Sequence, residues 1–307
     1  MWFIFALVAL LFWSGSDLFS KIGSRPDDKN SHWKMVIAVG LVMGLHAGYE
    51  IAFGGVKITF SAILTYLPAS LLYIGAMVMG YIALRYIELS VSSPICNTSG
   101  AAAALFLIIF FFSRAGIEGT GQLVGTIVGI AFCAAGVLAL GIVESREDDE
   151  IRALRQEHAN IKYAKSWIAI VLPILYLIID AAGTVADTFI LEVLDEEVAN
   201  VAYELTFLFM GVAAAIYVFL IKKERHLSIK RELPKLGGAV CETVGQFAYI
   251  FAIGSNAVAA APIISCYCAL SVIWGRVFLK EKLSWKHYLA IVVAVIGIGL
   301  LGFFGGE

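Results

Sequence analysis

Acidic, aromatic and amide side chains recur at helical spacing in three apolar stretches of the sequence. Residues three or four positions apart share one face of an α-helix, so each set forms a stripe. Carboxylates on such a stripe can hold a proton or pair with a cation, and the other groups can hydrogen-bond a small polar molecule. The stripes are Trp13, Ser16, Asp17 and Ser20; Tyr176, Asp180, Thr184 and Asp187; and Gly238, Glu242, Gln246, Tyr249 and Asn256. We expect them to line a common aqueous cavity.

Two of these carboxylates carry the strongest signal for binding or for proton transfer. An ionised group inside a bilayer costs about 2.5–3.5 kcal/mol on insertion scales, so its presence needs a reason. Asp180 lies about 20 Å along a helix from Trp167 and has no basic residue within one turn. Glu242 lies about 12 Å from Pro234, although Arg276 of the following helix could reach it.

Other ionisable residues have a structural explanation as good as the functional one. Two pairs could serve only to neutralise charge along one helix, namely Asp17 with Lys21 and His46 with Glu50. Asp187 and Glu204 lie near helix ends, where water could hydrate them. The candidate binding or coupling residues are Asp180, Glu242, Asp17, Gln246, Trp13, Tyr249, Glu204, His46 and Glu50.

Membrane-spanning helices must position these residues. The chain has 60% hydrophobic and 15% charged residues and a mean hydropathy of +0.88, which leaves too little polar surface to coat a soluble globule. Hydropathy divides it into ten stretches of about 20 residues, the length that crosses a hydrocarbon core of about 30 Å. The expected spans are 1–22, 33–54, 62–86, 91–113, 119–143, 167–191, 198–221, 234–254, 257–279 and 284–304.

The basic residues predict which loops face the cytoplasm. Of the 22 Lys and Arg residues, 20 lie in the odd-numbered loops, and the remaining two are Lys57 and Arg114. Cytoplasmic loops retain Lys and Arg because their translocation is costly. We therefore expect the odd loops in the cytoplasm and both termini outside. This sorting by side also argues against nucleic acid as a partner.

The chain divides into two halves that look like repeats. Residues 1–143 and 167–307 each hold five expected helices, and the charged segment 144–166 reads as a cytoplasmic linker. A shift of 168 residues places Pro94 on Pro262 and Phe110 on Phe278. Because each half has five helices, the second half must enter the membrane upside down relative to the first. Such inverted repeats form a site near the midplane, and rocking of one half against the other exposes this site to each side in turn. The expected fold is an all-α polytopic membrane protein of two inverted five-helix repeats.

The end of the chain resembles a known family. The stretch FLKEKLSWKHYLAIVVAVIGIGLLG, residues 278–302, is similar to the ending of EamA-type proteins of the drug/metabolite transporter superfamily. The preceding NAVAAAPIISCYCALSVIW, the opening LFWSGSDLFSK and the five-plus-five layout fit the same family. The first half departs from the pattern, because Ser113 and Arg114 stand where an acidic residue is expected and Glu118 follows a little later. The resemblance implies secondary transport of small metabolites.

These observations favour a secondary transporter of the cytoplasmic membrane. An acid-rich cavity suits an amine, an amino acid or a proton better than an organic anion. The sequence has no HExxH, phosphate-loop or GxSxG motif and no Cys/His metal spacing, so we expect no enzyme, no metal and no cofactor. The alternative is a non-transporting membrane sensor or a subunit of a larger complex. A glycine stripe at Gly121, Gly125 and Gly129 leaves open a homodimer.

Overall fold

The computed structural model describes residues 1–23, 28, 30–83, 96–145, 168–224, 229–278 and 283–306. These residues form helices and no strand. The elements are α1 (Trp2–Gly23), α2 (Ser31–Tyr49), η1 (Glu50–Gly54), α3 (Phe60–Ala83), α5 (Ser99–Phe110), η2 (Phe112–Arg114), α6 (Thr120–Ser145), α8 (Ile168–Ile190), α9 (Glu196–Ala215), η3 (Ile216–Ile221), α10 (Ile229–Ser265), α11 (Tyr267–Phe278) and α12 (Trp285–Phe304). Most of the predicted linker and Pro94 lie outside the described residues.

The helices follow the predicted spans closely. Eight described stretches are long and apolar enough to cross a membrane, and Ser99–Phe110 is a shorter apolar helix. One of the eight, Lys230–Phe278, runs through two predicted spans. Large apolar side chains such as Phe53, Phe60 and Phe303 are 75–81% exposed, as expected for side chains that face lipid. The number of ten crossings stays a prediction.

The boundary between the eighth and ninth predicted spans is a kink at Asn256. Its backbone leaves the helical region (φ −158°, ψ 82°), and its side-chain oxygen accepts a hydrogen bond from the Ala259 N–H at 3.1 Å. This is the geometry of an N-cap, so a new helix begins there. The Asn256 amide group also donates to the Gly305 carbonyl. Asn256 therefore joins two chain segments, and its predicted place on a cavity stripe is wrong.

A short helix begins after a turn at corresponding places in the two halves. Helix α10 stops at Ser265 and α11 starts at Tyr267, while turn residues precede Ser99 at the start of α5. Both α5 and α11 contain 12 residues. Their first residues, Ser99 and Tyr267, are 168 positions apart, and so are their last, Phe110 and Phe278. The predicted ninth span is thus two helical pieces.

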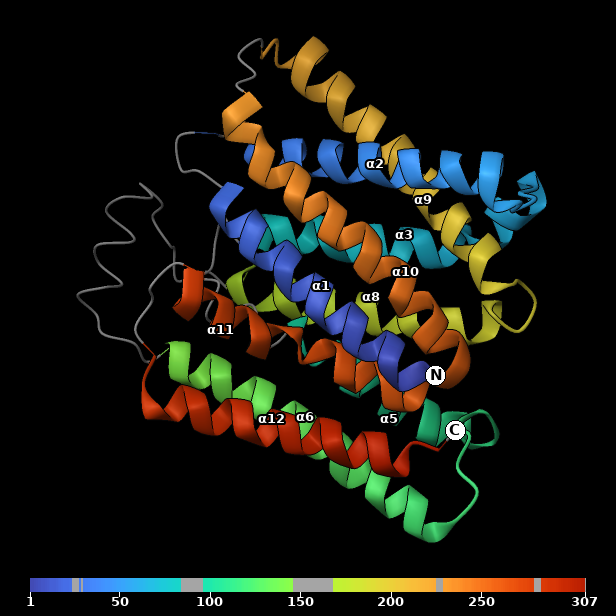
Figure 1. Ribbon diagram of the computed structural model, residues 1–307, viewed down its shortest axis with the longest axis vertical. Helices are drawn as coiled ribbons and strands as arrows, with labels where there is room; N and C mark the ends of the chain where they lie inside the picture. The colour runs from blue at the N-terminus through green and yellow to red at the C-terminus, as the bar shows by residue number, and fades with distance from the viewer. Residues whose placement is uncertain are drawn as a thin grey trace.

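Helix packing is symmetric when the halves are exchanged. In the first half, α1 packs on α10 and α11 of the second half. In the second half, α8 packs in the same way on α3 and α5 of the first half. Helices α2 and α9 pack on each other, as do α6 and α12, which lie side by side at one edge of the molecule (Figure 1). Both termini lie at the same end, where the Trp2 indole donates to the Gly306 carbonyl at 2.9 Å.

The glycines of α6 contact α12 of the same chain. A Cβ on Gly125 would lie 2.2 Å from the Phe304 ring, and one on Gly129 would lie 2.8 Å from Leu301. Gly121 has no neighbour within 4 Å. Two members of the predicted glycine stripe thus allow close packing inside the protomer.

Candidate functional site

A buried carboxylate network joins the three helices α3, α8 and α10. Asp187 of α8 is 0% exposed and accepts hydrogen bonds of 2.6 Å from Tyr66 and from Tyr73 of α3. The Tyr249 hydroxyl of α10 can donate either to the Tyr73 hydroxyl or to the Thr184 hydroxyl of α8, which lies 3.2 Å away. Of the two alternatives left open for Asp187, this burial contradicts simple hydration. Sequence showed its place near a helix end but not the tyrosines that cover it.

Asp180 lies two turns earlier on the same helix. Ser99, the first residue of α5, donates to its carboxylate at 2.6 Å. The Asp180 side chain is only partly buried, whereas Ser99 is 4% exposed. Asp180 is also close enough to Asp187 for their charges to interact. The structure thus brings Asp180 onto the interior face that its stripe predicts.

A second pair of carboxylates lies between α1, α10 and α11. Ser16 of α1 hydrogen-bonds Glu242 of α10, and Asp17 is near enough to interact with that glutamate electrostatically. Ser271 of α11 donates to Asp17 at 3.0 Å. The Lys21 side chain, its predicted intrahelical partner, lies outside the described part. Each half therefore supplies an aspartate on its first helix that accepts a hydrogen bond from a serine on the short helix of the other half.

Aromatic rings form a wall beside these carboxylates. Trp13 stacks on Tyr249 with ring centroids 5.1 Å apart, and Tyr267 meets Trp13 edge-on at 6.1 Å. The contact requires a glycine on α10, because a Cβ on Gly245 would lie 2.3 Å from the Trp13 ring. Such rings can attract a cation through their faces.

Two buried donors at this wall have no hydrogen-bond partner among the described residues. They are Trp13 Nε1 and Gln246 Nε2. Gln246 is 4% exposed and lies one turn from Glu242 on α10. A buried donor left unpaired costs about 1–3 kcal/mol, so a bound acceptor group would stabilise both.

The other three candidates, His46, Glu50 and Glu204, form a separate cluster at one end of the α2–α9 pair. His46 Nδ1 lies 2.8 Å and 3.0 Å from the two carboxylate oxygens of Glu204, which is 0% exposed. Asn200 donates to the same carboxylate at 2.9 Å. Glu50, the partner predicted within the helix, lies farther from His46, at 3.6 Å. The burial of Glu204 contradicts the alternative that this residue is simply hydrated.

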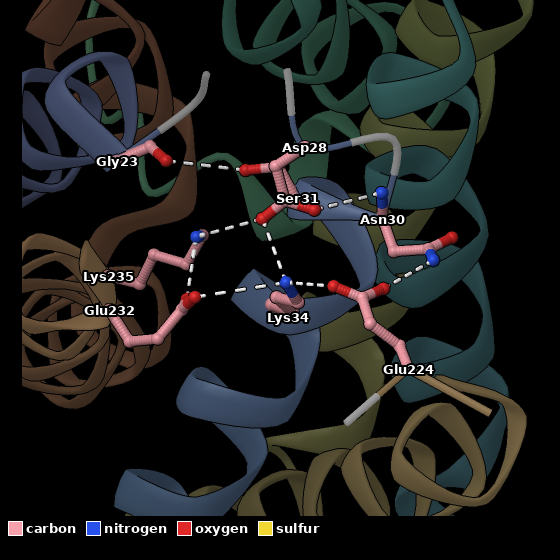
Figure 2. Close-up of polar contacts among 8 residues, drawn as sticks. All are labelled: Gly23, Asp28, Asn30, Ser31, Lys34, Glu224, Glu232 and Lys235. Carbon is pink, nitrogen blue, oxygen red and sulfur yellow. Dashed lines mark hydrogen bonds and ion pairs between the residues drawn. The ribbon is translucent and has the colours of Figure 1, made fainter. Parts of the chain in front are cut away.

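The opposite end of the same helix pair holds a network of ion pairs around Lys34 (Figure 2). Lys34 is 7% exposed and pairs with Glu224 after η3, with Asp28 at 3.0 Å and with Glu232 of α10 at 3.8 Å. Lys235 is 3% exposed and pairs with Glu232 at 2.7 Å. The hydrogen bonds from Lys34 and Asn30 lower the pKa of Glu224. These residues bind the ends of α2, α9 and α10 together.

Comparison with known proteins assigns the second half of the chain. Residues 167–303 match the EamA-like transporter family. Over these residues the chain is similar to EamA-like transporters, which confirms the resemblance predicted from its last helices. The apolar helices and this match indicate a multi-pass membrane protein.

A solved structure has a similar fold. The chain is similar to a protein of known crystal structure with a TM-score of 0.69 and 13% identity, over 97% of this chain and 95% of that one. At this identity the likeness speaks for the fold alone. No curated protein matches the sequence.

Proposed function

We propose that the protein is a secondary transporter that carries small amine-bearing metabolites, with amino acids favoured, across the cytoplasmic membrane. The observation that carries the proposal is the pair of cross-half contacts, Ser99 with Asp180 and Ser271 with Asp17. A site built from both halves changes its access when the halves rock against each other. No covalent step is needed.

The packing symmetry supports ten helices arranged as two inverted five-helix repeats. Exchange of the halves reproduces the main helix contacts, and α5 and α11 share both length and register. An odd number of helices per half requires the second half to enter the membrane in the opposite sense. Alternating access between the two sides follows from that arrangement.

The chemistry of the central groups supports an amino acid as substrate. The carboxylates of Asp180, Asp17 and Glu242 suit an ammonium group, and the rings of Trp13 and Tyr249 add a cation-binding face. The unpaired donors Trp13 Nε1 and Gln246 Nε2 suit the carboxylate of the same molecule. A simple amine would use only the acidic part of the site.

Uptake into proteoliposomes tests the proposal. Radiolabelled amino acids and amines are offered to the wild type, to Asp180→Asn and to Glu118→Gln, an exposed carboxylate outside the site. We expect Asp180→Asn to fold normally and to lose at least 90% of uptake, because Asn keeps the shape but not the charge. Glu118→Gln should transport like the wild type. Uptake by Asp180→Asn at the wild-type rate would remove this carboxylate from the site.

A further inference from the structure

The cluster of His46, Glu204 and Asn200 stands apart from the central carboxylates. It lies between α2 and α9, which hold equivalent places in the two halves and pack on each other. These helices touch through their backbones at Gly40 and Gly211, where a Cβ on Gly40 would lie 2.9 Å from the Gly211 Cα. The cluster is on one side of this crossing, and the Lys34 network is on the other. A change in the cluster therefore acts at one end of a crossed helix pair.

Charge balance inside the cluster depends on one proton. Glu204 is fully buried, and the only cationic group that contacts it among the described residues is His46. A buried carboxylate without a countercharge is strongly destabilising. Removal of the proton from the imidazolium would leave the glutamate charge uncompensated, so the pair gains and loses a proton as one unit.

The surroundings leave His46 as the group that exchanges this proton. Glu50 of η1 faces Nε2 at 3.6 Å, Asn200 of α9 is neutral, and α10 presents the edge of the Phe247 ring at 5.8 Å. The His46 side chain is 30% exposed while Glu204 is closed off. The imidazole thus has one exposed side and contacts the buried carboxylate on the other.

An open cavity lies at the same end of the molecule. A cavity of about 500 Å³ is lined by Gly55 and Lys57, which follow η1, and by Glu196 and Glu197, one turn before Asn200 on α9. Val56 at its edge packs on Ala47 and Val201, the neighbours of His46 and Asn200 on their helices. The cluster therefore lies next to an open cavity, and that cavity is not lined by residues of the central site.

We propose that His46, Glu204 and Asn200 form the proton-binding site that couples transport to a proton gradient. The proposal rests on the proposed function and names its coupling ion. With the proton bound, the charged pair clamps α2 to α9 at this end. Loss of the proton releases the clamp, and the helices can then rotate about the Gly40–Gly211 crossing. Tyr203, next to Glu204, packs edge-on against Tyr73 at 6.2 Å and so links the cluster to the Asp187 network.

Proton binding can be measured without any substrate. Histidine-labelled protein is placed in nanodiscs of phosphatidylethanolamine and phosphatidylglycerol, and the His46 resonance, identified by its loss in His46→Gln, is followed by NMR as pH changes. We expect Glu204→Gln to move its titration midpoint by one pH unit or more, and Glu118→Gln to leave it in place. An unchanged midpoint in Glu204→Gln would overturn the proposal.

Coupling is measured separately with a mixture of radiolabelled L-amino acids. The double variant His46→Gln/Glu204→Gln keeps a neutral hydrogen bond between α2 and α9. We expect it to exchange internal for external label but to accumulate at least tenfold less label than the wild type under an imposed pH gradient. Equal accumulation by both would refute the proton site. If the wild type neither exchanges nor accumulates label, the proposed function fails, while the NMR midpoint still decides on proton binding.

Discussion

At the scale of single residues, two hydroxyl groups hold the fully buried carboxylate of Asp187. Asp187 is enclosed on α8 and receives its two short hydrogen bonds from Tyr66 and Tyr73. Its donors are phenols, so its charge is solvated by dipoles rather than by a cation. A central site that relies on dipoles can change its proton content without breaking a salt bridge.

Loss of one of these phenols should destabilise the protein. Tyr66→Phe removes a donor and leaves a carboxylate oxygen unsatisfied, which costs about 1–3 kcal/mol. Tyr288→Phe is the matched control, because Tyr288 is 51% exposed on α12. Thermal unfolding in nanodiscs should show a lower melting temperature for Tyr66→Phe alone. Equal melting temperatures for the two variants would mean that the Tyr66 bond adds nothing to stability.

The sequence predicted which helix faces line the site, but not which side chains of other helices contact them. The stripes on α1, α8 and α10 bring Trp13, Asp180 and Glu242 to the interior, because spacing along a helix fixes which side chains share a face. Tyr66 and Tyr73 escaped notice although they are seven residues, about two turns, apart on α3. Their role depends on which helix packs opposite, and spacing within one helix does not carry that information.

At the scale of helices, one crossing point sets how closely α2 and α9 approach. A Cβ on Gly40 would lie 2.8 Å from the Phe207 carbonyl oxygen, so Gly40→Ala must push the helices apart. We expect lower thermal stability and slower transport. Gly48→Ala on the same helix is the control, since a Cβ there has no neighbour within 4 Å. Ala favours a helix over Gly by about 1 kcal/mol, so Gly48→Ala should be neutral or stabilising.

The Lys34 network makes helix docking sensitive to acid. The bond from Lys34, and then that from Asn30, lower the pKa of Glu224 below its ordinary value of 4.5. A carboxyl group whose pKa is depressed by folding contributes stability above its unfolded pKa, and loses it as the pH falls through the folded pKa. We expect unfolding to become easier as the pH falls below about 4.5, and Glu224→Gln to lack this part of the acid dependence. Denaturation of both proteins between pH 3 and 7 measures the difference, and parallel curves would contradict it.

Helix ends were predictable where hydrocarbon thickness fixes them, and not where a helix breaks inside an apolar stretch. The start and the end of α12 fall within a residue of the expected span 284–304. The break at Cys266 does not follow from hydropathy, because the residues around it are as apolar as the helices they separate. Its match in the first half becomes visible only when α5 and α11 are compared.

For the whole molecule, the sorting of basic residues predicts which end faces the cytoplasm. Both termini lie at one end, as the Trp2–Gly306 hydrogen bond requires. A reporter fused after Glu307 should therefore read outside, and one inserted between residues 146 and 166 should read cytoplasmic. The same side for both reporters would contradict an odd number of helices in the second half. A cytoplasmic C-terminus would reverse the orientation drawn from 20 of the 22 Lys and Arg residues.

The meeting of the chain ends also bears on how such a protein can be rearranged. Trp2 contacts Gly306, and the Phe3 ring would lie 2.7 Å from a Cβ on Gly302, so a short flexible segment suffices to join residue 306 to residue 1. A gene that starts with α8, runs to α12, crosses that segment and ends with α6 would encode the same helices in a new order. Since neighbouring ends favour circular permutation, either half can be synthesised first.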